Sequence, residues 1–499
     1  MDKQKLYAII EEKAPLLTRL SDKIWEYAEL SMLEYKSAAA YVQVLREEGF
    51  QVTENLCNIP TAFSGSFGSG KPVIGILGEY DALSGLSQEA GATEKKPLTE
   101  GGCGQGCGHN LLGAGALGAA IAIKEAIKSG DLSGTVIFYG CPGEEGCAGK
   151  TFMAREGVFK TLDAAITWHP GDTNEIMYGS NAACIQMEYA FSGTAAHAAG
   201  NPWSGRSALD AAELMNVGVQ FLREHMPVNS SIHYSFSDAG GISPNVVQPT
   251  AKLIYMVRST TVRNAKALLA RVDNIAKGAA LMTDTAVTSR QIDGTASTVS
   301  NHVLEEVLYK NLCDAPMPEY TQEELALAGK LRATFDTTKL PGHRTEEEIA
   351  YATRLRATYE TTELPGTRTN EDFSVKKFVL EQTKNGLLPM NNFIFPHTPC
   401  NPFSPGSTDV GDVSWLAPTA QFNAVTCPSG TPGHSWQIVT VGKSSIAHKG
   451  MALAAKVLAG ACADLMEDGA LLQKAREEFA LATAEGYDCP VDRPWTANT

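Results

Sequence analysis

The sequence predicts an α/β protein in which helices flank a largely parallel sheet. Three short apolar runs, 73–78, 134–140 and 164–168, have the length and composition of buried strands. A helical pattern at 111–128 lies between the first two runs. Strands that alternate with helices along a chain favour a parallel sheet, because each helix carries the chain back across the sheet.

Polar side chains follow each of these strands at its carboxyl end. Glu79 and Asp81 come after the first strand, Glu144 and Glu145 after the second, and His169 directly after the third. Open α/β sheets bind their ligands at the carboxyl ends of the strands. The sequence therefore predicts a functional site at this edge of the sheet.

A smaller α+β unit is predicted at 180–296, inserted into the larger domain. Its expected strands are 185–191, 232–236 and 253–258, and its expected helices are 207–225 and 262–279. The larger domain is then discontinuous and consists of 1–179 and 297–499. Helical patterns at 444–464 and 467–485 are expected to complete it.

An internal duplication interrupts the larger domain at 313–372. The segment 330–345 recurs, with few changes, as 354–369. Two copies are too few for a solenoid, which needs about three. We interpret the segment as an insertion of two short helices, each stopped by Leu-Pro-Gly, that elaborates the surface without chemistry.

Composition excludes several classes of function. The 499 residues carry a formal net charge of −15 and contain no basic block, so a nucleic-acid partner is not expected. The N-terminus reads as an amphipathic helix and not as a signal peptide. The apolar stretch 111–123 is too short to span a bilayer. The eleven cysteines are expected to be thiols in the cytoplasm.

Several residues at the predicted site are of the types that bind metals or move protons. Cys107 and His109 lie two residues apart in a Gly-rich turn before a helix, and His169 precedes a Pro-Gly turn. Of the adjacent Glu144 and Glu145, one can bind a metal while the other acts as a base. Each of these features also has an explanation without chemistry. Cys107 and His109 can belong to a tight turn, the two glutamates can be a solvated pair, and His169 can be a hydrogen-bonded core histidine.

A distal histidine completes the set. His434 lies in a Pro- and Gly-rich loop, His397 is its rival for the same role, and His448 is expected to cap or pack a helix. Together with the residues above, such a histidine can hold two divalent ions that activate a water and polarise a carbonyl. Thiolate, imidazole and carboxylate suit Zn²⁺ and tolerate Mn²⁺.

Five motifs in this order resemble the amidohydrolase branch (subfamily D) of metallopeptidase family M20. They are the segments 78–83, 106–110, 143–146, 168–171 and 193–211. The resemblance covers about residues 15 to 465, apart from the duplication. It implies a catalytic domain that binds two metal ions, with an inserted lid that also forms the dimer.

The resemblance also implies residue roles. The implied metal ligands are Cys107, His109, Glu145, His169 and His434. Glu144 matches the general base, and Asp81 matches a carboxylate that orients a ligand from outside the first coordination sphere. Many members of the wider family have a ligand histidine two residues before this aspartate. Glu79 occupies that position here, which is a departure from the family pattern.

In the inserted unit, the resemblance implies residues that act on the substrate. His197 matches a histidine that reaches the active site of the partner subunit and stabilises the oxyanion. Asn245 and Arg258 match residues that hold the substrate carboxylate, and His233 is a further candidate for that pocket. A homodimer is therefore expected, and a related second subunit stays open.

The implied activity is metal-dependent hydrolysis of an amide in a carboxylate-bearing substrate, through a metal-activated water. The segments 244–249 and 431–437 look most similar to aminobenzoyl-glutamate hydrolases, so p-aminobenzoyl-glutamate or a similar N-acyl amino acid is the expected substrate. A dipeptidase or an N-acyl amino acid deacylase of the same fold is the alternative. The sequence also leaves open a cysteine hydrolase built on Cys107 and a non-catalytic subunit.

Overall fold

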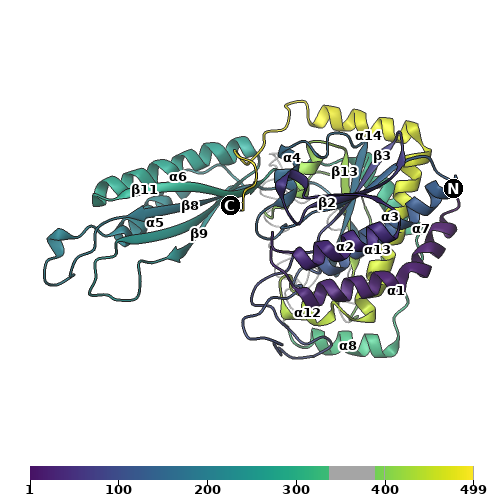
Figure 1. Ribbon diagram of the computed structural model, residues 1–499, viewed down its shortest axis with the longest axis horizontal. Helices are drawn as coiled ribbons and strands as arrows, with labels where there is room; N and C mark the ends of the chain where they lie inside the picture. Colours follow the sequence, from purple (N-terminus) through teal and green to yellow (C-terminus); the bar gives the residue numbers. More distant parts are fainter. Residues whose placement is uncertain (336–381, 383–387, 398, 498–499) are drawn as a thin grey trace, which may run out of the picture.

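The computed structural model describes residues 1–335, 382, 388–397 and 399–497. Its larger domain is built on a seven-stranded sheet in the order β1-β2-β4-β3-β5-β13-β6 (Figure 1). The strands are β1 Gln51–Glu54, β2 Phe63–Ser69, β3 Val73–Gly78, β4 Gly134–Gly140, β5 Ala164–Gly171, β6 Glu175–Met177 and β13 Thr419–Val425. The central strands β4, β3, β5 and β13 are mutually parallel, while the pairs at both edges are antiparallel. The predicted α/β class with a largely parallel sheet is confirmed.

Helices cover both faces of this sheet. The helices of the larger domain are α1 Lys3–Tyr27, α2 Tyr35–Glu47, η1 Leu56–Asn58, α3 His109–Ser129, α4 Gly149–Arg155, α7 His302–Asp314, α8 Gln322–Arg332, α11 Val410–Ser414, α12 Trp436–Val441, α13 Ser445–Glu467 and α14 Gly469–Ala482. Residues of α1, α3, α7 and α13 share one hydrophobic cluster with Ile74 and Ile76, whereas α4 packs with Leu77 on the opposite face. Ile76 and Leu77 face opposite sides because successive side chains of a strand point to opposite faces of the sheet.

Helix α3 is the central helix of the larger domain. Among the described helices it alone is long and apolar enough to cross a membrane, and 89% of its most apolar window is buried inside the protein. A helix that is apolar all round is typical of a protein core. Gly115 and Gly118 lie against the Trp168 indole and the Leu17 side chain, so α3 packs closely on both the sheet and α1.

Strand β5 is longer than the sequence indicates. It stays paired with β13 up to Gly171 and Val425, because β13 extends beside it over the same length. His169 therefore lies within the strand and not directly after it. The prediction that the strand stops at 168 was wrong, and this pairing fixes the direction of the His169 side chain relative to the sheet.

A second, four-stranded antiparallel sheet in the order β11-β8-β10-β9 extends away from the larger domain (Figure 1). The elements of this unit are β8 Ala183–Ser192, η2 Pro202–Ser204, α5 Ala208–Arg223, β9 Ser231–Asp238, β10 Thr250–Ser259, α6 Val262–Thr283 and β11 Ala286–Thr295. Helices α5 and α6 pack on the sheet through residues such as Met215, Val219 and Val272. A short parallel pair, β7 Ser180–Asn181 and β12 Phe403–Ser404, forms a sheet of its own.

The described start of the predicted insertion at 313–372 packs on the larger domain. Ala328 and Leu331 of α8 are fully buried against Val425, Val441 and Ile446. The two predicted repeat helices lie outside the described residues, apart from 330–335. The expected boundaries of the domains and of the insertion stay predictions.

Candidate metal centre

The start of helix α3 carries Cys107 and His109, two of the predicted ligands. Gly108 stands between them with φ 78°, in the left-handed region that favours glycine, and produces a sharp turn. At Gly113 a Cβ atom would lie 2.6 Å from the Glu79 carbonyl oxygen. Only glycine therefore lets the first turn of the helix approach the segment that follows β3.

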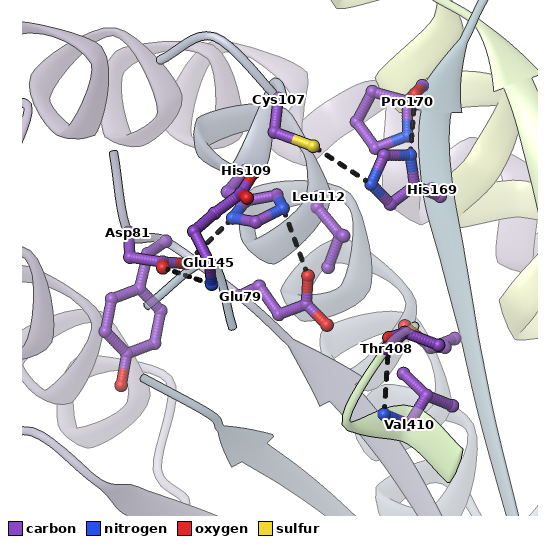
Figure 2. Close-up of polar contacts among 12 residues, drawn as sticks. Glu79, Asp81, Cys107, His109, Leu112, Glu145, His169, Pro170, Thr408 and Val410 are labelled. Atoms are coloured by element: carbon purple, nitrogen blue, oxygen red, sulfur yellow. Dashed lines mark hydrogen bonds and ion pairs between the residues drawn. The ribbon is translucent and has the colours of Figure 1, made fainter. Parts of the chain in front are cut away.

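The imidazole of His109 lies between two carboxylates of this segment (Figure 2). Its Nδ1 is 2.8 Å from Asp81 Oδ1, and its Nε2 is 3.3 Å from Glu79 Oε2. Burial raises the pKa of Asp81, but His109, the Glu145 N–H and the Ser31 hydroxyl together outweigh burial and hold that pKa below its ordinary value. Asp81 is therefore an acceptor, and His109 donates its Nδ1 proton to it. The lone pair of Nε2 is then available for a metal.

Cys107 and His169 approach each other across the same space. His169 Nδ1 lies 2.7 Å from the Pro170 carbonyl oxygen, and its Nε2 lies 3.3 Å from Cys107 Sγ (Figure 2). Burial raises the pKa of the Cys107 thiol, but His169 and His109 outweigh burial and lower it to about 6. At neutral pH the group is mainly the thiolate, which is the form that binds metals.

The turn after β4 positions the paired glutamates. The Gly143 N–H donates to Glu34 Oε1 at 2.8 Å, and the Glu145 N–H donates to Asp81 Oδ2 at 3.0 Å. The first bond fixes the turn to the segment before α2, and the second fixes it to the segment after β3. As a result, Glu145 Oε1 lies 3.1 Å from His434 Nε2, a residue from the loop before α12.

The donor atoms form three groups, and two of them share Cys107. These two are Cys107 with His109 and His169, and Cys107 with Glu145 and His434. The third is His109 with Glu144 and Glu145, and within each group the donor atoms lie within 4.8 Å of one another. In the described part of the chain, the buried atoms His109 Nε2 and Glu145 Oε1 have ion-pair contacts with Glu79 and His434 but no aligned hydrogen bond. Buried polar atoms are almost always satisfied in proteins, and these donor types are those of zinc sites. The residues therefore fit a pair of divalent ions.

A cavity of 390 Å³ opens onto these groups. It is lined by Cys107, Glu145, His169 and His434. Glu79 and Glu144 also line it, although neither belongs to the two donor groups that share Cys107. Burial, and then the charges of Glu79 and Asp409, raise the pKa of Glu144 well above its ordinary value. A carboxylate with a raised pKa beside a metal site is suited to accept and return a proton.

The predicted residues of the inserted unit lie outside this cavity. His197 and Asn245 are exposed and lie side by side, with the Ala198 N–H bonded to the Asn245 carbonyl, and His233 is exposed on β9. Arg258 comes nearest, because its Nη1 donates at 2.7 Å to the hydroxyl of Ser407, which lines the cavity. Within one described chain these four residues do not join the metal-binding groups, and their roles stay predictions.

The structure distinguishes the rival histidines. His397 is buried beside Glu305, at 3.5 Å between Nε2 and Oε2, with its ring against Tyr178. His448 Nε2 lies 3.0 Å from Asp22 Oδ1 on helix α1, as expected of a packing residue. Of the three, only His434 is grouped with Cys107 and Glu145.

Sequence reasoning missed a buried lysine beside the site. Lys150, at the start of α4, is completely buried and contacts both Glu79 and Asp409. A Gly-Lys-Thr segment a few residues after the paired glutamates carries no recognisable signal. Asp409 is too distant in sequence to be paired with it by pattern, although its neighbours Thr408 and Val410 line the cavity.

The comparisons with known proteins agree with this arrangement. Residues 75–428 match the model of peptidase family M20/M25/M40. The chain is 42% identical, over 98% of both chains, to a protein named as one subunit of the p-aminobenzoyl-glutamate hydrolase of Escherichia coli K12. It is also 25% identical to a protein named as another subunit of that hydrolase, over 58% of this chain and 76% of the relative.

More distant similarity extends to a mouse Xaa-Arg dipeptidase, 28% identical over 55% of this chain and 62% of the relative. Among solved structures, a dinuclear metal-binding peptidase of family M20 from Bacillus subtilis superposes with a TM-score of 0.53. That match has 16% identity and covers 92% of this chain and 99% of the other, so it shows the shared fold. The chain thus belongs to peptidase family M20/M25/M40 and is a metallohydrolase of that family.

Proposed function

We propose that this chain is a two-metal amidohydrolase that cleaves the amide bond of p-aminobenzoyl-glutamate or of a closely similar N-acyl amino acid. The observation that carries the proposal is the pair of donor groups that share Cys107 and border one cavity. The 42% identity to the Escherichia coli hydrolase subunit over the full length supports the choice of substrate. A dipeptidase is the second candidate, and the similarity to Xaa-Arg dipeptidases favours it.

Five residues would hold the two ions. Cys107, His109 and His169 would hold one, and Glu145 and His434 would hold the other together with Cys107, which belongs to both donor groups. Zn²⁺ and Mn²⁺ both suit this donor set. When bound, such a pair supplies Lewis acidity for the amide carbonyl and lowers the pKa of a water.

The protons of the reaction are assigned to Glu144. Its carboxylate lines the cavity and groups with the donor atoms of His109 and Glu145, so it lies beside the residues that would hold the ions. Accepting the proton of that water and returning it to the leaving amine requires one group with a pKa near the working pH. The adjacent Glu145 is engaged with His434, so the two neighbouring carboxylates have separate roles.

Substrate recognition is assigned to the inserted unit. Arg258, whose guanidinium bonds Ser407 at the cavity wall, would exchange this contact for the substrate carboxylate. Asn245 and His233 would contribute to the same pocket. His197 lies beside Asn245 but outside the cavity of its own chain, so we assign its action on the oxyanion to a homodimer in which it enters the partner's site.

Association with a related but different chain is part of the proposal. Two of the relatives are named as different subunits of one Escherichia coli hydrolase, and both are similar to this chain. The chain is therefore expected to associate with a relative of the kind that shows 25% identity to it. The described fold and cavity are compatible with a catalytic role for this chain within such a complex.

The test of the substrate is a panel of amides assayed by release of the free amine. The purified full-length chain, loaded with Zn²⁺ or Mn²⁺, is given p-aminobenzoyl-glutamate, several N-acyl amino acids and several dipeptides. We expect the highest kcat/KM for p-aminobenzoyl-glutamate, and a large loss when the substrate carboxylates are amidated. A dipeptide that is cleaved faster than every acyl amino acid would refute the substrate and favour the second candidate.

A further inference from the structure

A completely buried ion cluster borders the candidate metal centre. Lys150 Nζ lies 2.6 Å from Glu79 Oε1 and 2.6 Å from Asp409 Oδ1, and the Lys150 N–H also donates to Asp409 Oδ2. The side chains of Lys150 and Asp409 are 0% exposed, and that of Glu79 is 3% exposed. Burying such a cluster removes three charged groups from water and adds little net stability, so a role in fixing geometry is the better explanation.

Lysine engages only one oxygen of Glu79. Glu79 lines the cavity, and its other oxygen, Oε2, lies 3.3 Å from His109 Nε2 (Figure 2). His109 donates its Nδ1 proton to Asp81, so Nε2 is the nitrogen that faces this oxygen, at ion-pair distance but without an aligned hydrogen bond. When a metal takes the place of a proton on Nε2, the ion lies next to Glu79 Oε2 as well.

We propose that Glu79 is a further ligand of the ion bound by Cys107, His109 and His169, and that Lys150 is the positioning residue that directs its free oxygen there. This inference rests on the proposed two-metal centre. Lys150 occupies Oε1, so Glu79 offers one oxygen and binds through Oε2 alone. The carboxylate thereby raises the number of protein ligands at this ion from three to four.

Asp409 supplies the matched control. It contacts the same ammonium at the same 2.6 Å and is equally buried, but it does not line the cavity. Replacing either carboxylate with its amide removes one negative charge next to Lys150. Only replacement of Glu79 also changes the group that faces His109. Comparing Glu79→Gln with Asp409→Asn therefore separates the effect of losing a ligand from the effect of losing a charge beside Lys150.

The experiment uses cobalt as the metal, with the full-length chain stripped of metal and titrated with Co²⁺. Four proteins are compared: wild type, Glu79→Gln, Glu79→Asp and Asp409→Asn. The shorter Glu79→Asp variant keeps a negative charge near Lys150 while it shortens the reach of the carboxylate toward His109. Readouts are bound cobalt per chain, affinity by chelator competition, and visible absorption, in which the thiolate charge-transfer band reports Cys107 and the ligand-field bands report coordination number.

If Glu79 is a ligand, both Glu79 variants bind one of the two ions at least ~100-fold more weakly, since carboxylates outside the coordination sphere cost only about 10- to 100-fold. Their ligand-field bands also become more intense, because the coordination number falls, while the thiolate band stays. Asp409→Asn keeps the wild-type spectrum. Glu79 variants with wild-type affinity and spectrum would overturn the assignment. A wild-type chain that binds no cobalt through Cys107 would overturn the metal centre itself.

Discussion

Asp81 Oδ1 lies 2.8 Å from His109 Nδ1, and both side chains are completely buried. The second oxygen of Asp81 accepts from the Ser31 hydroxyl at 2.8 Å and from the Glu145 N–H at 3.0 Å. One carboxylate therefore selects the tautomer of one candidate ligand and fixes the backbone of another. It connects the segment after β3 with the turn after β4 and with the start of α3.

Replacing Asp81 tests this role. In Asp81→Asn the amide oxygen can still accept one hydrogen bond, but the negative charge that holds the His109 proton on Nδ1 is lost. We expect metal affinity to fall by about 10- to 100-fold, which is the usual effect of losing a partner of a ligand histidine. Chelator competition measures the affinity. Unchanged affinity in a folded Asp81→Asn protein would show that His109 is not oriented in this way.

Metal binding is expected to strengthen as pH rises. The pKa of Cys107 is lowered to about 6, so protons compete with the metal for the thiolate as pH falls through that value. Contacts with Cys107 and Glu145 raise the pKa of His434 to about 10, so a metal must also displace a proton there at neutral pH. Titration calorimetry in buffers of different ionisation enthalpy measures the released protons. Binding without proton release between about pH 5 and 8 would contradict this donor set.

Stability without metal is expected to depend on Glu34. Burial, and then the charge of Asp81, raise the pKa of Glu34 to about 8, above its ordinary value of 4.5. The folded state therefore holds this proton more tightly than the unfolded state. The resulting stabilisation is complete below the unfolded pKa and is lost as pH rises through about 8.

The variant Glu34→Gln mimics the protonated group and lacks this dependence. As pH rises from about 5 to 8.5, the metal-free wild type should lose stability that the variant keeps. The difference between their free energies of unfolding should change by on the order of a few kcal/mol in favour of the variant. Denaturant unfolding across this pH range measures the difference. Glu26→Gln, on the exposed face of α1, is the control and should show no such gain. Parallel pH profiles for wild type and Glu34→Gln would refute the raised pKa.

The assignment of His197 to the partner's site predicts complementation between two inactive variants. In a mixture of His197→Ala and Glu144→Ala chains, a mixed dimer contains one site with both an intact Glu144 and an intact His197 from the other chain. Random reassociation at equal amounts should restore about a quarter of the wild-type rate. Turnover of the mixture against each variant alone measures the effect. Activity that stays at the level of the separate variants would place His197 in its own chain's site or outside catalysis.

The sequence was sufficient to predict the strands that carry the site. The runs at Val73–Gly78 and Gly134–Gly140 are buried strands with the expected ends, because short and largely apolar runs that are followed by Glu79 and by Pro142 leave little choice of strand boundaries. Parallel pairing of β3, β4 and β5 then brings the residues after them to one edge. The convergence of Asp81, Glu145 and His169 follows from that topology.

What the sequence did not predict depends on contacts between distant segments. Lys150 and Asp409 are 259 residues apart, and nothing in either segment indicates a buried pair. Similarly, His434 and His397 both lie in Pro-rich loops, and only the folded chain places His434 against Glu145. Side-chain orientation, which decides such pairs, is set by packing and not by periodicity.

The most direct test of the two-metal mechanism is hydrolysis of p-aminobenzoyl-glutamate by metal-stripped protein before and after reloading with Zn²⁺ or Mn²⁺, for wild type and Glu144→Ala. We expect stripping to abolish turnover and reloading to restore it. The variant should bind the same number of ions as wild type and yet turn over about 10²- to 10⁴-fold more slowly, because it lacks the proton acceptor. Turnover that survives stripping and is lost in Cys107→Ser would contradict the metal mechanism and show that the Cys107–His169 pair is a thiol nucleophile and its base.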